Sequence, residues 1–207
     1  MPIFHKEIDQ NTEEWLEIRR AKITGSTHQP LLVSGRQEKG FGAGAMTLLY
    51  KLLEECLTDE LQPNFGGNKA TEFGHENEDL GREYYELQTF EILDSVGFVE
   101  KNEWIGTSPD RLIRGKKEGV EFKCLPKKHI QIVETGEYDK SHYSQCQWNM
   151  WVCEYEAWNL VYFHPKMPEK AKMKVFRFEP DLKLWAQFDD RSQAMIDLVK
   201  ERLKKYK

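Results

Sequence analysis

The chain has 207 residues, of which 31% are charged and 39% hydrophobic, and its formal net charge at pH 7 is −5. This length and composition predict a single globular domain over residues 1–207 and exclude a disordered chain. The acidic balance excludes a protein that coats nucleic acid nonspecifically, although basic side chains can still gather where nucleic acid is gripped locally.

Targeting and redox signals point to the cytoplasm. The apolar runs are short and the start MPIFHKEIDQ has no basic segment leading into an apolar one, so we expect neither a membrane span nor a secretory signal. The four cysteines lack the paired spacing of a zinc site. We therefore expect reduced core thiols.

The first predicted element is a short helix that Asn11 or Thr12 caps, with Glu14 available for a capping box and Trp15 and Ile18 on one side. The glycine-rich stretch SGRQEKGFGAGA comes later and lacks the lysine–serine ending of a phosphate loop. It is therefore predicted to be a mobile loop.

Two helices are predicted next, over residues 46–57 and 71–88. In the second, apolar side chains recur at helical spacing and are expected to face the core: Phe73, Leu80, Tyr84 and Leu87. Gly74, Glu78 and Arg82 then share the other face. Taken alone, Glu78 is interpreted as a surface charge paired with Arg82.

Strands dominate the middle of the chain, at residues 98–100, 104–107, 111–113 and 120–124. A helix over about 141–154 follows, with Gln145 at its polar edge. WNLVYFHP and MKVFRFEP are predicted as strands that proline ends, and residues 182–205 as a closing amphipathic helix. This order predicts an α/β (α+β) fold with a central mixed β-sheet flanked by helices.

The stretch TSPDRLIRGKKEGVEFKC, residues 107–124, carries the first chemical signal. Glu121 and Lys123 alternate with apolar residues, which predicts a strand with one buried face and places the acid and the base on the same side. The polar run 114–119 predicts a hairpin that brings Asp110 beside Glu121. Two carboxylates this close repel, and sharing Mg²⁺ relieves the repulsion. An exposed Glu-x-Lys pair is also common without any function, so this stretch alone leaves both interpretations open.

Five segments extend the signal over nearly the whole chain, in the order IRRAKITGS, EFGHENED, TSPDRL, GVEFKC and YSQCQWNMWV. Together, in this order and at these intervals, they resemble the phage lambda exonuclease family of viral recombination nucleases. That family lies within the PD-(D/E)xK superfamily, so the resemblance implies a restriction-endonuclease-like core.

The resemblance implies catalytic roles for matching residues. The implied metal ligands are Asp110, Glu121, the backbone carbonyl of Phe122, and Glu78. Lys123 matches the lysine that positions or activates the attacking water. Gln145 matches the glutamine beside the active site, and Gln147, the second of that pair, points elsewhere on a helix.

The resemblance also implies a pocket for a terminal 5′ phosphate, built from Arg19, Ser26 and Ser108. Here the sequence departs from the family pattern at one position. His129, preceded by Lys128, stands where the family has an arginine, so these two residues are the candidates for the remaining DNA contact.

The implied function is a Mg²⁺-dependent 5′-to-3′ exonuclease that degrades one strand of double-stranded DNA to mononucleotides and leaves 3′ overhangs for strand annealing. The resemblance further implies two Mg²⁺ ions per site, with Mn²⁺ as a substitute, and a ring-shaped homotrimer on DNA ends. It also implies a single-strand annealing recombinase as partner, and a phage or prophage gene expressed in the cytoplasm of a bacterial host.

Two other functions stay open: an endonuclease of the same fold, and a non-catalytic DNA-end-binding recombination protein. A terminal-phosphate pocket at Arg19 and Ser26 separates the exonuclease from the endonuclease. Alternatively, Arg19 flanks the first helix and binds backbone phosphates unspecifically.

Overall fold

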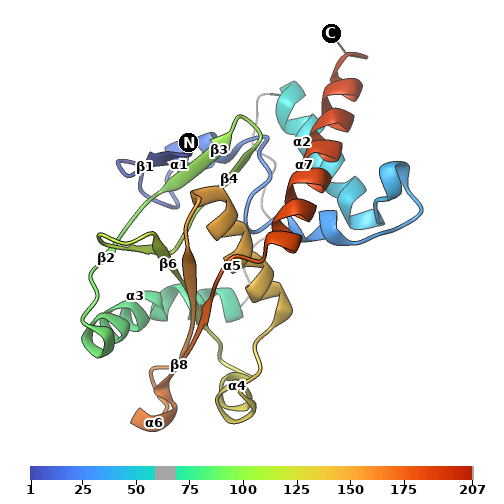
Figure 1. The fold of residues 1–207 in the computed structure, drawn as a ribbon. Coiled ribbons are helices and arrows are strands. Elements are labelled where there is room, and N and C mark those ends of the chain that lie inside the picture. Colours follow the sequence, from blue (N-terminus) through green and yellow to red (C-terminus); the bar gives the residue numbers. More distant parts are fainter. Residues whose placement is uncertain (59–68, 207) are drawn as a thin grey trace.

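A mixed β-sheet lies at the centre of the computed structural model, which describes residues 1–58 and 69–206 (Figure 1). Within these residues the sheet has five strands in the order β2 (Leu93–Asp94), β5 (Arg111–Ile113), β6 (Glu118–Cys124), β7 (Ala157–Phe163) and β8 (Met173–Phe178). Strands β6 and β7 run parallel, and the other neighbours run antiparallel. A smaller antiparallel sheet joins β1 (Ile3–His5), β3 (Phe98–Asn102) and β4 (Ile105–Thr107).

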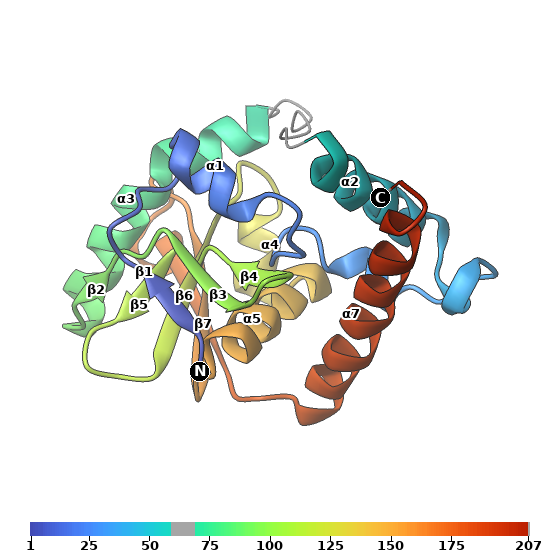
Figure 2. The ribbon, with the colours of Figure 1, turned by 90° about the horizontal axis from the view of Figure 1, so that it is seen from above.

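Helices cover both faces of the central sheet, as Figures 1 and 2 show. The helices are α1 (Glu13–Arg19), α2 (Ala43–Thr58), α3 (Lys69–Thr89), α4 (His129–Thr135), α5 (Lys140–Cys153), α6 (Glu169–Lys172) and α7 (Leu182–Leu203), with 3-10 turns at Gln29–Leu32 and Glu38–Gly40. Helix α3 packs on one face of the sheet and α5 on the other, where α2 and α7 add a further layer. The predicted mixed sheet flanked by helices is confirmed.

Two hydrophobic cores follow from this layering. Tyr85 of α3 packs with Val120 and Phe122 on one face of β6. Trp148 of α5 and Leu160 of β7 belong to the larger core on the opposite side. The central strand β6 is therefore covered from both sides, and the prediction that it has one buried face is wrong.

Side chains at helix starts explain where several helices begin. Thr12 Oγ1 accepts a hydrogen bond from the Trp15 amide at 3.2 Å, which confirms Thr12 as the cap of α1. A capping box needs an acidic residue at the third position of the helix, but Glu14 is the second residue and Trp15 the third. The predicted capping box is therefore wrong. Asp139 and Asp181 cap α5 and α7 in the same way.

The apolar stripe predicted for α3 is wrong for two of its residues, because Leu80 is 49% exposed and Leu87 is 67% exposed. The helix instead turns Gly81 and Tyr85 towards the sheet. A Cβ at Gly81 would lie 3.2 Å from the Phe163 ring, so the missing side chain allows a close approach. Glu78, one turn before Gly81, lies on this sheet-facing side.

Several short elements carry too little pattern for prediction, namely β1, β2, α4 and α6. All four cysteines are free thiols, and three of them are buried, as predicted. Across the two described ranges, each helix is too short or too polar to cross a membrane.

Candidate functional site

Strand pairing brings Asp110 to the middle of β6. Arg111 lies opposite Val120 in the antiparallel β5–β6 pair, so the preceding residue, Asp110, is level with the next part of β6. Asp110 Oδ2 accepts a hydrogen bond from the Phe122 amide at 2.7 Å. The hairpin and the neighbourhood of Asp110 and Glu121 that the sequence predicts are confirmed.

Glu121 is a buried carboxylate, only 1% exposed, with donors on both oxygens. Lys123 Nζ donates to Oε1 at 2.6 Å, and Asn149 Nδ2 of α5 donates to Oε2 at 3.0 Å. Thr107 Oγ1 in turn donates to Asn149 Oδ1. This chain of hydrogen bonds fixes the carboxylate and the ammonium group, so Glu121 and Lys123 are not a solvated surface pair.

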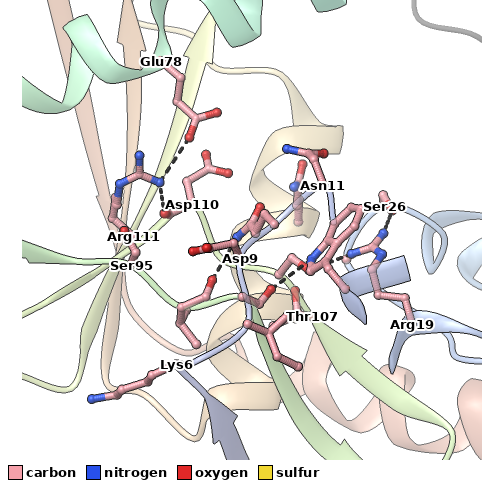
Figure 3. Close-up of a pocket in the computed structure, with 18 of the residues that line it drawn as sticks. Lys6, Asp9, Asn11, Arg19, Ser26, Glu78, Ser95, Thr107, Asp110 and Arg111 are labelled. Atoms are coloured by element: carbon pink, nitrogen blue, oxygen red, sulfur yellow. Dashed lines mark hydrogen bonds and ion pairs between the residues drawn. The ribbon is translucent and has the colours of Figure 1, made fainter. Parts of the chain in front are cut away.

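A third carboxylate, Glu78, lies near Asp110 and contacts Arg111 (Figure 3). We refer to Asp110, Glu121 and Glu78 together as the carboxylate group. Arg111 Nη1 donates to Glu78 Oε1 at 3.3 Å and to the backbone carbonyl of Asp110, and Nη2 donates to Asp79 Oδ1 at 3.0 Å. Arg82, the partner considered for Glu78 in the sequence, pairs with acidic residues along α3 instead. The surface-pair interpretation of Glu78 is therefore wrong.

Burial and mutual repulsion change the protonation of these carboxylates. Burial, and then the charge of Asp110, raise the pKa of Glu78 to about 7 and that of Glu121 to about 8. Burial alone would lower the pKa of Lys123, but the charges of Glu121 and Asp110 outweigh it and raise that pKa. Near neutral pH the site thus holds an ammonium group among carboxyls that attract a proton or another cation.

The donor set fits a hard divalent cation. Three carboxylates and the nearby Phe122 carbonyl are oxygen ligands of the kind that Mg²⁺ prefers. In the part of the chain that the structure describes, however, no three His, Cys, Asp or Glu side chains converge closely enough to hold an ion as they stand. Asp110, Glu121 and Glu78 are each hydrogen-bonded to a donor of the protein instead.

A cavity of about 610 Å³ joins two of these carboxylates, Glu78 and Asp110, to a second group of polar side chains. Glu78, Asp110 and Arg111 line one end, and Figure 3 shows Arg19 with Ser26 at the other. Further lining residues include Gln145, Ser108, Trp15 and Asn11. The structure therefore brings together in one cavity residues that lie far apart in the sequence.

The second group, which we call the anion site, combines a positive charge with two hydroxyls, the residue types that suit an anion. Arg19 donates to Ser108 Oγ at 2.7 Å and to Ser26 Oγ at 3.4 Å, and its guanidinium lies 4.1 Å from the centre of the Trp15 ring. Trp15 Nε1 also donates to Ser108 Oγ, at 2.9 Å. Because that oxygen already accepts two hydrogen bonds, its own hydrogen is left to donate to a ligand. Burial lowers the pKa of Arg19 to about 10, so the guanidinium stays charged at neutral pH.

His28 holds the loop that carries Ser26. Its Nδ1 lies 2.9 Å from the Gly25 carbonyl, and its Nε2 lies 2.7 Å from Ser144 Oγ. Burial lowers the pKa of His28 to about 4, so the ring is neutral and rigidly bonded. A Cβ at Gly25 would lie 2.9 Å from both Thr107 Oγ1 and Asn149 Oδ1. Gly25, next to Ser26, thus packs directly against Thr107 and Asn149, the two side chains that support Glu121.

Two predicted DNA-binding residues lie elsewhere. The His129 side chain is buried, and its Nε2 lies 2.7 Å from the Ala171 carbonyl, because the ring at the start of α4 is turned towards α6. Lys128 lines a separate hollow of about 200 Å³ beside α4. This arrangement gives neither residue a contact with the cavity. Gln147 points away from it towards Glu179 and the start of α7, as helical geometry predicts.

Sequence reasoning missed Asn149 and Arg111. Asn149 lies one helical turn after Gln145, so the spacing of polar residues in YSQCQWNMWV could have indicated it. Arg111 directly follows Asp110 in TSPDRL, but a single sequence gives no sign that its side chain turns towards α3.

The metal-free protein should lose stability as the pH rises from about 6.5 to about 8.5. Glu78 and Glu121 bind protons more tightly when folded, with pKa values of about 7 and 8 against 4.5 otherwise. Their contribution to the free energy of unfolding is complete below about pH 4.5 and is lost as the pH passes through the folded pKa values, at a cost of roughly 2 kcal/mol in this window. The buried His28 and His142 oppose this loss, because their folded pKa values of about 4 lie below the 6.5 of an unfolded histidine. Most of that opposing effect is complete by about pH 6.5 and the rest by about pH 7.5, so the carboxyls dominate the window.

Urea denaturation with a chelator at the two pH values measures this loss. Glu78→Gln should reduce the difference, and Glu83→Gln, which alters an exposed acid of the same helix, should leave it unchanged. Equal stability of the wild-type protein at both pH values would contradict the burial of ionisable carboxyls.

Comparisons with known proteins identify the family and the fold. A family model described as the YqaJ-like viral recombinase domain matches residues 14–156. No curated protein sequence is significantly similar to the chain. The crystal structure of the alkaline exonuclease LHK-Exo from Laribacter hongkongensis has a TM-score of 0.82 at 24% identity, covering 94% of this chain and 96% of that one. Its complex with dAMP gives 0.83 at the same identity and coverage. A phage related exonuclease from Haemophilus somnus 129PT gives 0.73 at 15% identity, covering 90% and 96%. At these identities the likeness establishes a shared fold.

Proposed function

Because the chain belongs to the YqaJ-like viral recombinase family, we propose that it is a Mg²⁺-dependent exonuclease that degrades one strand of duplex DNA from the 5′ end. The observation that carries this proposal is the single cavity whose lining includes Glu78 and Asp110 of the carboxylate group together with the anion site. A nuclease that starts at an end needs both parts, one to hold the terminal phosphate and one to cut the next phosphodiester.

Asp110, Glu121, Glu78 and the Phe122 carbonyl are the proposed ligands of Mg²⁺, or of Mn²⁺ as a substitute, with two ions in the site. When bound, such ions supply charge neutralisation for the scissile phosphate and a water molecule of lowered pKa. The ligands come from α3, β6 and the residue before β5, so the packing of α3 through Gly81 decides whether Glu78 can join the other two.

Lys123 is proposed to orient the attacking water and to offset negative charge in the transition state. Its raised pKa keeps the ammonium group protonated at neutral pH, so it donates hydrogen bonds and does not accept a proton. Lys123 Nζ lies 2.6 Å from Glu121 Oε1, which fixes the position of the ammonium group. Gln145, which also lines the cavity, is available for a further contact with the substrate.

The anion site favours terminal over internal cleavage. Arg19, Ser26 and Ser108 present one charged fork and two hydroxyls, which suit the several oxygens of a terminal phosphate. An endonuclease has no need for such a site beside its carboxylates. The ordered pair of Glu121 and Lys123 likewise favours an enzyme over a DNA-end-binding protein without catalysis.

The remaining proposals follow from the family resemblance. We propose action as a homotrimer on duplex ends in the cytoplasm of a bacterial host, with 3′ overhangs passed to a single-strand annealing recombinase.

Digestion of linear duplexes with a 5′ phosphate, resolved by product size, tests the function. A 5′-labelled duplex should release labelled mononucleotide in the presence of Mg²⁺ and none with a chelator. A 3′-labelled duplex should shorten progressively, and a closed circular duplex should stay intact. Cutting of the circle would support the endonuclease, and end binding without any cleavage would support the non-catalytic protein.

A further inference from the structure

Arg111 places a positive charge among the carboxylates at one end of the cavity. Its guanidinium bridges α3 and the start of β5 through Glu78 and the Asp110 carbonyl (Figure 3). It also donates to Asp79, and its side chain is only 15% exposed. None of the proposed catalytic steps uses this arginine.

Arg111 occupies one of the two oxygens that Glu78 can offer to a metal ion. A cation that bound Glu78 and Asp110 would compete with Arg111 for the lone pairs of Glu78 Oε1. The ion and the guanidinium would also repel each other, and partial burial weakens the screening of that repulsion. Binding of a divalent ion to Glu78 therefore weakens the ion pair between Arg111 and Glu78, and that ion pair in turn weakens binding of the ion.

The resting position of Arg111 leaves one donor unsatisfied. Its Nε is buried and has no hydrogen-bond partner among the described residues. A buried donor without a partner destabilises the arrangement that buries it. Asp79 is largely exposed and accepts from Nη2 at 3.0 Å, so it can keep hold of the guanidinium if Glu78 lets go. The unsatisfied Nε thus favours movement of the side chain, and Asp79 can still accept a hydrogen bond from the guanidinium after it leaves Glu78.

From these contacts we propose that Arg111 is an internal counter-ion that neutralises Glu78 before a divalent cation binds and that the cation must displace. The inference rests on the proposed function in that it takes the carboxylates as metal ligands. It adds that this arginine weakens metal binding, so that Arg111 sets the Mg²⁺ concentration that the site requires.

Calorimetric titration of the DNA-free protein with Mg²⁺, and separately with Mn²⁺, tests the inference. At about pH 9, two units above the Glu78 pKa of about 7, the carboxyls are ionised. Arg111→Gln should bind either ion about tenfold more tightly than the wild-type protein, since one competing charge-assisted contact is gone. Arg111→Lys, which keeps the charge but not the fork, should fall between the two.

Arg82→Gln is the matched control. Arg82 lies on α3, the helix of Glu78, and contacts Asp79, Glu83 and Glu86 but does not line the cavity, so the affinity should stay at the wild-type value. Unchanged or weaker binding by both Arg111 variants, with wild-type binding intact, would overturn the inference and leave the proposed function standing. A wild-type protein that binds neither ion would overturn the inference together with the metal dependence of the proposed function.

Discussion

Lys123→Ala should slow DNA cleavage by about 10²–10⁴-fold, the usual effect of removing a positioned acid–base group. The loss follows because the ammonium group that faces the carboxylates is no longer present to orient the water or to offset developing charge. Asp110→Asn should have an effect at least as large, since it also removes a proposed ligand. Single-turnover rates at saturating Mg²⁺ measure the effect.

Lys117→Ala is the control for Lys123→Ala, because Lys117 lies in the same hairpin with an exposed side chain and pairs with Glu156 at 3.6 Å. It should cleave at the wild-type rate. Urea denaturation should show that both variants fold. Rapid cleavage by Lys123→Ala would remove this lysine from the mechanism.

Alanine is a poor substitution with which to test the role of Glu121. A strand-surface carboxylate could be cut back to alanine without harm, but Glu121 is buried and accepts from Lys123 and Asn149. Glu121→Ala would leave two buried donors without partners and cost about 1–3 kcal/mol for each. Loss of activity in that variant would therefore mix chemistry with unfolding.

Arg19→Ala should slow digestion of 5′-phosphorylated ends by about ten- to hundredfold and should affect 5′-hydroxyl ends much less. Each charge-assisted hydrogen bond to a phosphate contributes about 1.5–3 kcal/mol, and about 1.4 kcal/mol corresponds to a factor of ten. The structure supplies a reason for selectivity, because the guanidinium is already held by Ser108, Ser26 and the Trp15 ring.

Parallel rates on the two kinds of end decide this point, with Arg20→Ala as the control. Arg20 is the next residue and pairs with Glu17 at 2.7 Å. Equal slowing of both substrates by Arg19→Ala would mean that Arg19 binds backbone phosphates and recognises no terminus.

Local periodicity predicts most of the carboxylate group correctly. The alternation in GVEFKC places Glu121 and Lys123 on one side, and the hairpin before it brings in Asp110, because both features depend on neighbouring residues alone. These parts of the site need no knowledge of the rest of the fold. Glu78 does need it, because helical spacing predicts Leu80 on the core side of α3 and Glu78 on the other face, whereas Leu80 is 49% exposed and Glu78 lies on the sheet-facing side.

Tertiary packing decides what periodicity cannot. Apolar Leu80 and Leu87 look like core residues, yet the contact through Gly81 turns them outwards. His129 matches a family position by count, but the start of α4 buries its ring against the Ala171 carbonyl. In both cases a neighbour distant in sequence determines the outcome.

The close contact at Gly25 bears on the size of the fragment that each cut releases. Gly25 precedes Ser26 of the anion site, and it leaves no space for a Cβ beside Thr107 and Asn149, which hold Glu121. Under the proposed function, the point that grips the end of the strand and the point that cuts it cannot slide relative to each other. With this spacing fixed, each cut falls at the same number of bonds from the bound end of the strand. The released fragment therefore has the same length at every step along the DNA.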